Sequence, residues 1–207
     1  MANASSNTTI RPKNKGQKVF FKNPVLEKLT RTHIAVPITI FVLFSAALIV
    51  YAFTYSALPA YLIGVLFLSG FLIFTLIQYF VHRYVFHMEP DTEIKEKLQY
   101  NFHGVHHEYP KDKGRLAMPP VVSVILAATL LFVFHYVIGE YAFAFLPGFV
   151  MGYTAYIFVH YAVHAYQPPK NFLKILWVNH AIHDYEDHNK AFGVSSPLWD
   201  FVFRTRP

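Results

Sequence analysis

The sequence predicts an all-α integral membrane protein, with four transmembrane helices and a cytosolic helical cap. Three observations carry this prediction: 54% of the 207 residues are hydrophobic, only 14% are charged, and the apolar residues gather in four long runs without charge. About a quarter of the residues in an ordinary soluble domain are charged, whereas a run of ~20 apolar residues can cross a bilayer as a helix. One membrane domain over residues 32–207 accounts for the chain after its basic start.

The chain opens with a basic segment, residues 1–31, in which Glu27 is the single acidic residue. The first ten residues are rich in Ala, Asn, Ser and Thr, and we expect them to be disordered. This basic region and the apolar run that follows are both too long for a cleaved signal peptide.

The four apolar runs are each long enough to span the hydrocarbon core as a helix. The first two are joined by a short uncharged link that ends at Pro59, and the last two by Gly139-Glu140. Pro119 and Pro120 begin the third run, where a missing backbone donor is harmless. The expected spans are about 34–55, 58–80, 118–138 and 141–161.

The basic residues test this topology. All 18 Lys and Arg residues lie in residues 1–31, 82–117 or 162–207, which four spans place on one side of the membrane. The positive-inside rule identifies that side as the cytosol, so we expect both termini in the cytosol, with residues 82–117 and 162–207 as the cap. Because topology explains the net charge of +6, we expect no nucleic acid partner.

Histidine is unusually frequent, and nine of the 12 histidines recur in four clusters at or just beyond the predicted cytosolic face. Asp184 directly follows the last cluster, and His188 lies further on. Neutral imidazole is a common ligand of iron, zinc and copper, and nine imidazoles with one carboxylate would suit two metal ions. The clusters are His82 and His87; His103, His106 and His107; His160 and His164; and His180 and His183.

The spacings within the clusters are mostly helical. In a helix, His103, His106 and His107 would point from one face, because residues three and four apart are neighbours. The spacing of five from His82 to His87 does not fit a straight helix. We therefore expect a helix bend or end where the second span leaves the membrane.

The ligand chemistry narrows the function. The chain has no cysteine, which excludes disulfides and cysteine-ligated clusters, and nitrogen-rich ligation favours iron, zinc or copper over magnesium or calcium. A structural zinc site needs only four ligands, and a hydrolytic site would use a carboxylate base such as Glu108. Two irons could activate O2 to attack an unactivated C–H bond, and a lipid acyl chain is the substrate that such a site would meet.

Two other classes of membrane protein remain open. A haem-binding electron-transfer protein would need paired histidines on facing spans, and His135 and His160 are the only start for one. A metal transporter would need ionisable residues along the bilayer midplane, and the spans hold almost none. We expect His33 and His135 to be structural residues.

From about residue 60 to the C-terminus, the ordered histidine boxes resemble those of the membrane fatty acid hydroxylase and sterol desaturase superfamily. Residues 103–120, HGVHHEYPKDKGRLAMPP, and the closing residues 192–200, FGVSSPLWD, resemble fatty acid 2-hydroxylases in particular. The resemblance implies four transmembrane helices, a cytosolic cap and two iron ions held by the boxes, which zinc can replace in a purified protein. It also implies hydroxylation of an acyl chain, free or within a lipid such as a sphingolipid, at C2 with O2 as co-substrate. A sterol or carotenoid hydroxylase or desaturase is the nearest alternative.

The sequence departs from the family at its last box, which usually reads HxxHH but here ends in His183-Asp184. We expect Asp184 to replace the missing imidazole as a ligand, with His188 as the alternate. By resemblance, Asp112 and Arg115 would bind the lipid headgroup or orient a metal ligand, although a plain salt bridge in the cap is equally open.

The source of electrons is a second departure, because some members carry a fused cytochrome b5 and this chain has no room for one. Electrons are then expected from a separate carrier, a cytochrome b5 or a ferredoxin with its reductase. A short chain without a fused carrier favours a bacterial inner membrane over the endoplasmic reticulum.

Overall fold

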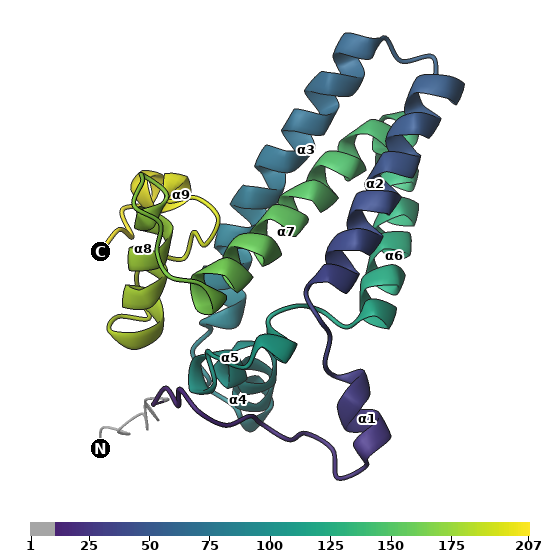
Figure 1. Cartoon of the computed structure of the whole chain (residues 1–207). Helices are drawn as coiled ribbons and strands as arrows, with labels where there is room; N and C mark the ends of the chain where they lie inside the picture. The colour runs from purple at the N-terminus through teal and green to yellow at the C-terminus, as the bar shows by residue number, and fades with distance from the viewer. Residues whose placement is uncertain (1–10) are drawn as a thin grey trace.

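A computed structural model describes residues 11–207, so the disorder predicted for the first ten residues concerns a segment outside the described chain. The described residues form helices and turns and no β-strand, which confirms the all-α prediction. Four long helices stand side by side (Figure 1): α2 (Ala35–Tyr55), α3 (Ala60–Val81), α6 (Pro120–Ile138) and α7 (Ala142–Ala165).

Each long helix coincides with one of the predicted apolar runs. The largest difference is at the end of α7, which continues about one turn beyond the predicted span. By length and composition, three continuous helical stretches are able to cross a membrane: Ala35–Tyr55, Ala60–Phe86 and Lys113–Ala165. The third has 53 residues and includes both α6 and α7.

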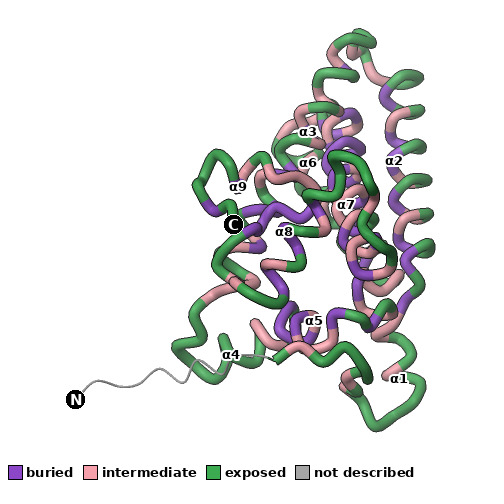
Figure 2. Tube along the Cα trace, turned by 60° about the vertical axis from the view of Figure 1, so that its left-hand side comes forward, coloured by how far each residue is buried: buried purple, intermediate pink, exposed green. Residues whose placement is uncertain are grey.

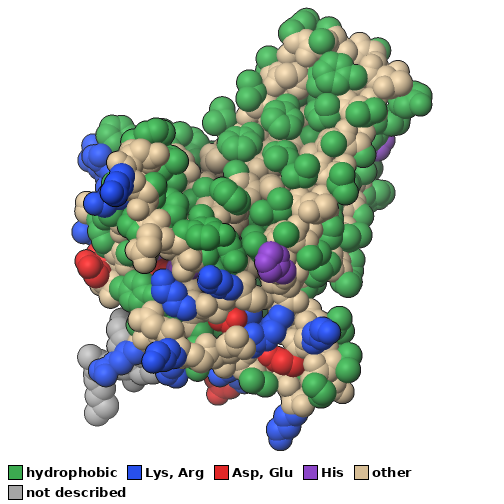
Figure 3. Space-filling view, in the orientation of Figure 1, with side chains coloured by type: hydrophobic (Ala, Val, Ile, Leu, Met, Phe, Trp, Pro, Cys, Tyr) green, Lys and Arg blue, Asp and Glu red, His purple; other side chains and the backbone are tan. Residues whose placement is uncertain are grey.

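The outer surface of these helices is apolar. Large side chains such as Leu43, Phe53, Leu68 and Phe132 are more than half exposed. On the face shown in Figure 3, hydrophobic side chains cover the long helices, whereas charged side chains gather at the end of the molecule where α3 and α7 finish. A soluble protein rarely exposes so large a contiguous apolar surface, and lipid tails would cover it without cost.

Helix α7 forms the centre of the bundle, and buried residues are concentrated along it (Figure 2). It packs backbone to backbone against α3 at two glycines. A methyl group on Gly148 would lie 1.8 Å from the carbonyl oxygen of Phe67, and one on Gly70 would lie 2.1 Å from that of Phe145. Small residues permit such close approach between apolar helices, and this contact fixes where the ends of α3 and α7 stand.

The shorter elements lie at the end of the bundle where α3 and α7 finish (Figure 1). Two of them, η1 and η2, are single π-helical turns, and η3 is a 3₁₀ turn. Another 3₁₀ turn, η4 (Gly139–Tyr141), joins α6 to α7. The elements at the α3–α7 end are α1 (Pro24–Leu29), η1 (His82–Phe86), α4 (Glu93–Gln99), η2 (Tyr100–Gly104), α5 (Val105–Glu108), η3 (Lys113–Arg115), α8 (Lys174–Tyr185) and α9 (Leu198–Val202).

The C-terminal segment is bonded to the last turns of α3. The indole N–H of Trp199 donates to Thr75 Oγ1 over 2.9 Å, and the hydroxyls of Tyr79 and Thr205 share a hydrogen bond of 2.9 Å. These contacts place α9 and the residues that follow it beside the end of α3.

The glycine contact between α3 and α7 yields a stability prediction. Gly148→Ala should destabilise the protein by ~1–3 kcal/mol, the usual cost of inserting a methyl group into a well-packed core, because the two backbones must separate. The measurement is the thermal unfolding midpoint of the purified protein in detergent.

The matched control is Gly64→Ala, also in an apolar helix, where a methyl group meets nothing within 4 Å. This change should leave stability unchanged or raise it by up to ~1 kcal/mol, because alanine favours the helix. Equal midpoints for both variants would contradict the proposed close approach.

Candidate metal centre

Nine histidines from four separate segments of the chain meet at the end of the bundle. The end of α3 with η1, the turn from η2 into α5, the last turns of α7, and α8 each contribute at least two of them. Seven are buried and two partly buried. They are His82, His87, His103, His106, His107, His160, His164, His180 and His183.

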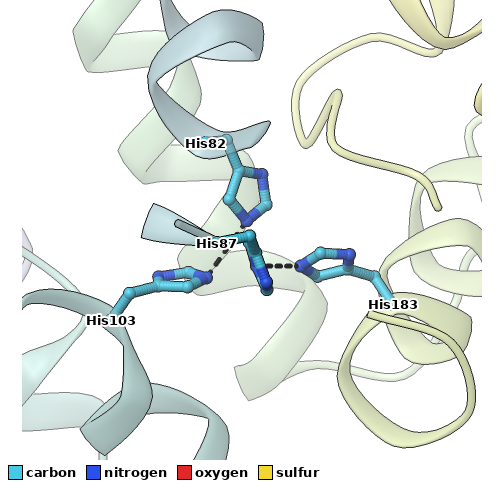
Figure 4. Close-up of side chains that lie close together, drawn as sticks. All are labelled: His82, His87, His103 and His183. Carbon is cyan, nitrogen blue, oxygen red and sulfur yellow. Dashed lines mark hydrogen bonds between the residues drawn. The ribbon is translucent and has the colours of Figure 1, made fainter. Parts of the chain in front are cut away.

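Four of these residues form the first histidine group: His82, His87, His103 and His183 (Figure 4). One ring nitrogen from each lies within 4.8 Å of the others. The Nε2 atoms of His82 and His103 are 3.1 Å apart, and those of His87 and His183 are 3.0 Å apart. The rings therefore point their nitrogens at a common centre.

The π-helical turn η1 explains the spacing of five residues in this group. The backbone N–H of His87 donates to the carbonyl of His82 over 3.2 Å, the i to i+5 bond of a π-helix. A wider turn brings residues five apart to the same side, and such turns are frequent at functional sites. The helix bend or end expected at this point is thus a π-helical turn that continues α3.

The second histidine group consists of His106, His160, His164 and His180. The Nε2 atoms of His106 and His160 are 3.1 Å apart, and those of His164 and His180 are 2.8 Å apart. His160 and His164 stand one turn apart on α7. The turn by which α7 continues beyond the predicted span therefore carries His164, a member of this group.

His107 and Asp184 lie between the two groups. The Nε2 of His107 is 2.9 Å from that of His103 in the first group, and His107, His183 and Asp184 form a third set with metal-ligand spacing. The histidines at 103–107 therefore do not face a single centre, although the expectation that they share one helix face predicted that they would. His106 and His107 are successive residues and point about 100° apart.

The donor atoms fit metal ions. The Nδ1–H of His82 donates to the carbonyl of Phe192 over 2.6 Å, and the Nδ1–H of His183 donates to that of Lys190 over 2.6 Å. Each Nε2 is then left with a lone pair that faces other imidazoles. Nitrogens bound ~2.1 Å from one metal stand about 3 to 3.4 Å apart, which is close to the spacings within both groups.

Burial favours the neutral form of five of these imidazoles. It lowers the pKa of His87 from 6.5 to about 3. The pKa of four further rings outside the apolar helices is lowered well below 6.5, first by burial and then by neighbouring imidazoles. These rings are His103, His107, His180 and His183. A metal ion would therefore not have to displace protons from them at neutral pH.

The sequence reasoning did not assign a role to the residues that orient the first group. Asp200 is fully buried and accepts hydrogen bonds from the backbone N–H groups of Phe192 and Gly193. A methyl group on Gly193 would lie 2.6 Å from that carboxylate. In the sequence, the closing segment 192–200 carries only a resemblance, whereas its fold places the carbonyl that holds His82.

Asp112 and Arg115, the remaining expected site residues, belong to none of the sets with metal-ligand spacing among the described residues. Arg115 pairs with Glu27 and donates to Thr30 Oγ1, and buried Asp112 lies 3.4 Å from Arg31, so both join the cap to residues 11–31. Glu108 accepts from Lys13 and Tyr100.

Three other histidines are outside both groups. The Nδ1–H of His188, the alternate ligand, donates to the carbonyl of His183 over 2.6 Å. His33 accepts from the backbone N–H of Ala35, and His135 bonds the carbonyl of Gly139, as expected of structural residues.

Two cavities adjoin the second histidine group. One of about 250 Å³ is mainly apolar and is lined by His164, His180 and Asp184 together with Trp177 and Val178. Another of about 220 Å³ reaches His106 and is walled by Phe20, Phe102, Asp112 and Arg115. Residues of this group therefore border cavities on two sides.

Comparisons with known proteins give one family. A model of the fatty acid hydroxylase family matches residues 67–205. The ceramide very long chain fatty acid hydroxylase scs7 of Schizosaccharomyces pombe is 34% identical over 186 residues, which are 87% of this chain and 52% of that protein. The dihydroceramide fatty acyl 2-hydroxylase FAH2 of Arabidopsis thaliana is 33% identical over 195 residues, 91% of this chain and 79% of that protein.

A solved structure is also similar. The hydroxylase domain of full-length scs7p has a TM-score of 0.83 and 32% identity, and the match covers 93% of this chain and 73% of that one. The rat fatty acid 2-hydroxylase is 35% identical over 144 residues, 68% of this chain and 39% of that protein. The chain spans about half the length of the scs7 relative.

The support of the first group by Asp200 is testable. Asp200→Asn should weaken zinc binding to the purified protein ~10- to 100-fold, because an amide cannot accept from both backbone N–H groups and the carbonyl that orients His82 shifts. Competition with a coloured chelator measures this affinity. Asp91→Asn, at an exposed carboxylate paired with Lys95, is the matched control, and equal zinc affinity in both variants would refute the role.

The metal-free protein, prepared with a chelator, should lose stability as the pH falls below ~6.5. Folded, its buried imidazoles stay neutral, with the pKa of His87 at about 3; unfolded, they take up protons near pH 6.5. The unfolded state thus binds more protons in this interval, so stability that is complete above pH ~6.5 declines towards pH ~3. Thermal midpoints at pH 8, 7, 6 and 5 test this, and a constant midpoint from pH 7 to 5 would disprove it.

Proposed function

The chain belongs to the fatty acid hydroxylase family, as its resemblance predicted, and we propose that it hydroxylates a lipid acyl chain at C2 in an O2-dependent reaction. The observation that carries the proposal is the pair of adjacent, buried histidine groups with converging Nε2 atoms. Two metal ions held by these groups would supply the chemistry of oxygen activation. A structural zinc site would need only one such group.

The proposed ligands are the nine clustered histidines and Asp184. Two iron ions suit this nitrogen-rich set, with zinc as a substitute in purified protein. The first group and His107 would hold one ion, and the second group and Asp184 the other. The carbonyls of Phe192 and Lys190 hold two of the rings in the tautomer that presents Nε2, which is the usual support of a metal-binding imidazole.

The substrate would approach the second group. The cavity lined by Trp177, Val178, His164 and His180 is mainly apolar and suits methylene groups beside the donor atoms. Its walls would exclude water and hold C2 near the metal ion. The named relatives act on ceramide or fatty acyl groups, and we propose a free or lipid-bound acyl chain for this protein.

The apolar helices support a proposed membrane arrangement. The 53-residue stretch Lys113–Ala165 would cross twice, once as α6 and once as α7, giving four crossings with α2 and α3. Both termini and the short elements of the cap would then lie on the side that carries the Lys and Arg residues, the cytosol. The relatives named above come from yeast, a plant and a mammal, which does not favour the bacterial inner membrane expected from sequence.

Electrons would come from a separate carrier, either a cytochrome b5 or a ferredoxin with its reductase. The basic side chains of the cap form an attractive surface for an acidic carrier. The haem-binding alternative has no support here, because His160 faces His106 in the second group and His135 bonds Gly139 at the far end of α6.

A mass-spectrometric acyl profile of host cells tests the reaction. Cells that express the protein should contain 2-hydroxy acyl chains that form only with O2. His106→Ala should abolish this product while the protein still inserts into the membrane, because the second group loses a donor. His135→Ala, outside both groups, should retain it.

The position of the hydroxyl group decides among the alternatives. A hydroxyl group or double bond elsewhere on the chain, or on a sterol or carotenoid, would move the protein to another branch of the superfamily. Full product in the His106→Ala variant would refute the assignment of the site.

A further inference from the structure

Asp184 is buried without a partner for its charge. Its side chain is 1% exposed, and neither carboxylate oxygen has a hydrogen-bond donor among the described residues. A buried carboxylate without compensation costs several kcal/mol, so a native fold that keeps one has something to neutralise it. The groups around it are imidazoles, whose nearest nitrogens stand 3.5 to 3.7 Å from its oxygens, beyond the usual hydrogen-bond distance.

The two oxygens of Asp184 face different histidine groups. Oδ2 is 3.5 Å from the Nε2 atoms of both His164 and His180 and 3.7 Å from that of His106. These three nitrogens belong to the second group. Oδ2 is thus placed as one more donor to the same centre.

Oδ1 faces the first group through His107. It lies 3.6 Å from His107 Nδ1, a nitrogen that is buried and has no other partner in the described chain. The opposite nitrogen of that ring, Nε2, lies 2.9 Å from His103 Nε2. A shift of about half an ångström would bring Oδ1 and Nδ1 within hydrogen-bond distance.

We propose that Asp184 couples the two metal positions: Oδ2 binds the ion of the second group, while Oδ1 accepts the Nδ1–H of His107 and so orients that ring towards the ion of the first group. This inference rests on the proposed dinuclear centre. A carboxylate can do both because it has two oxygens, whereas a histidine at position 184 could supply the ligand but no acceptor oxygen for His107.

The coupling makes the two positions interdependent. Loss of the carboxylate removes a ligand from the second group and the orienting acceptor from the first, and loss of such an acceptor usually costs a metal-binding imidazole 10- to 100-fold in affinity. A carboxylate that only binds the second ion would leave the first group unaffected.

The experiment measures zinc binding to purified protein in detergent, with one group disabled at a time. In a His160→Ala/His164→Ala background, which leaves the first group, Asp184→Leu should weaken zinc binding at least ~10-fold. Asp184→Asn should recover most of this loss, because its amide oxygen can still accept from His107. Asp184→His should not recover it.

The reverse background separates the two roles. With His82→Ala/His87→Ala, which leaves the second group, Asp184→Leu should again weaken zinc binding, but here Asp184→His should restore it by supplying an imidazole. In the first-group background, adding Asp184→Leu to His107→Ala should cause no further loss, because both changes remove the same contact. The thermal midpoint of each metal-free variant checks that it remains folded.

Each outcome bears on one claim. A first-group affinity that changes less than twofold with Asp184→Leu overturns the coupling but leaves the proposed hydroxylase. A wild-type protein that binds two zinc ions and shows the predicted Asp184 effects, yet forms no hydroxylated product with iron and a carrier, overturns the proposed reaction and leaves the coupling.

Discussion

Nine imidazoles bring their Nε2 atoms together in a largely buried space, and the fold has to hold them there. Pairs of these nitrogens lie 2.8 to 3.1 Å apart. Metal ions between the rings would bind such nitrogens directly. Until a metal ion binds, the stability of the surrounding structure must offset the cost of burying so many polar rings.

Two rigid features of the fold hold the rings in position. The first is the contact of α3 with α7 at Gly70 and Gly148, where the backbones touch and fix the ends of the two helices that present His82 and His160. The second is the buried carboxylate of Asp200, which holds the loop whose carbonyl bonds His82. The donors therefore stand on packed helices and on a loop with satisfied hydrogen bonds, the arrangement that keeps a site in position.

The sequence was sufficient to predict the long helices and which histidines cluster, because long apolar runs and repeated spacings are local signals. It did not reveal how the histidines divide into two groups, since that depends on how α5 and α8 face each other across the cap. It left a salt bridge open for Arg115 but did not identify Glu27 as the partner, because ion pairs between residues 88 positions apart leave no periodic pattern. The π-helical turn at His82 could be foreseen only as an irregularity in the spacing.

The division between the groups follows a rule of helix geometry. Residues four apart face the same centre, as His160 and His164 do, whereas residues three apart belong to different groups, as His180 and His183 do. Four residues turn a helix by about 40° beyond one revolution, and three leave it about 60° short, so a box of the form HxxHH spreads its side chains over two centres. Asp184 stands four residues after His180, and Oδ2 accordingly faces the second group. An aspartate at this position of the box thus keeps the direction of the ligand, and its other oxygen, Oδ1, faces His107 at 3.6 Å from Nδ1.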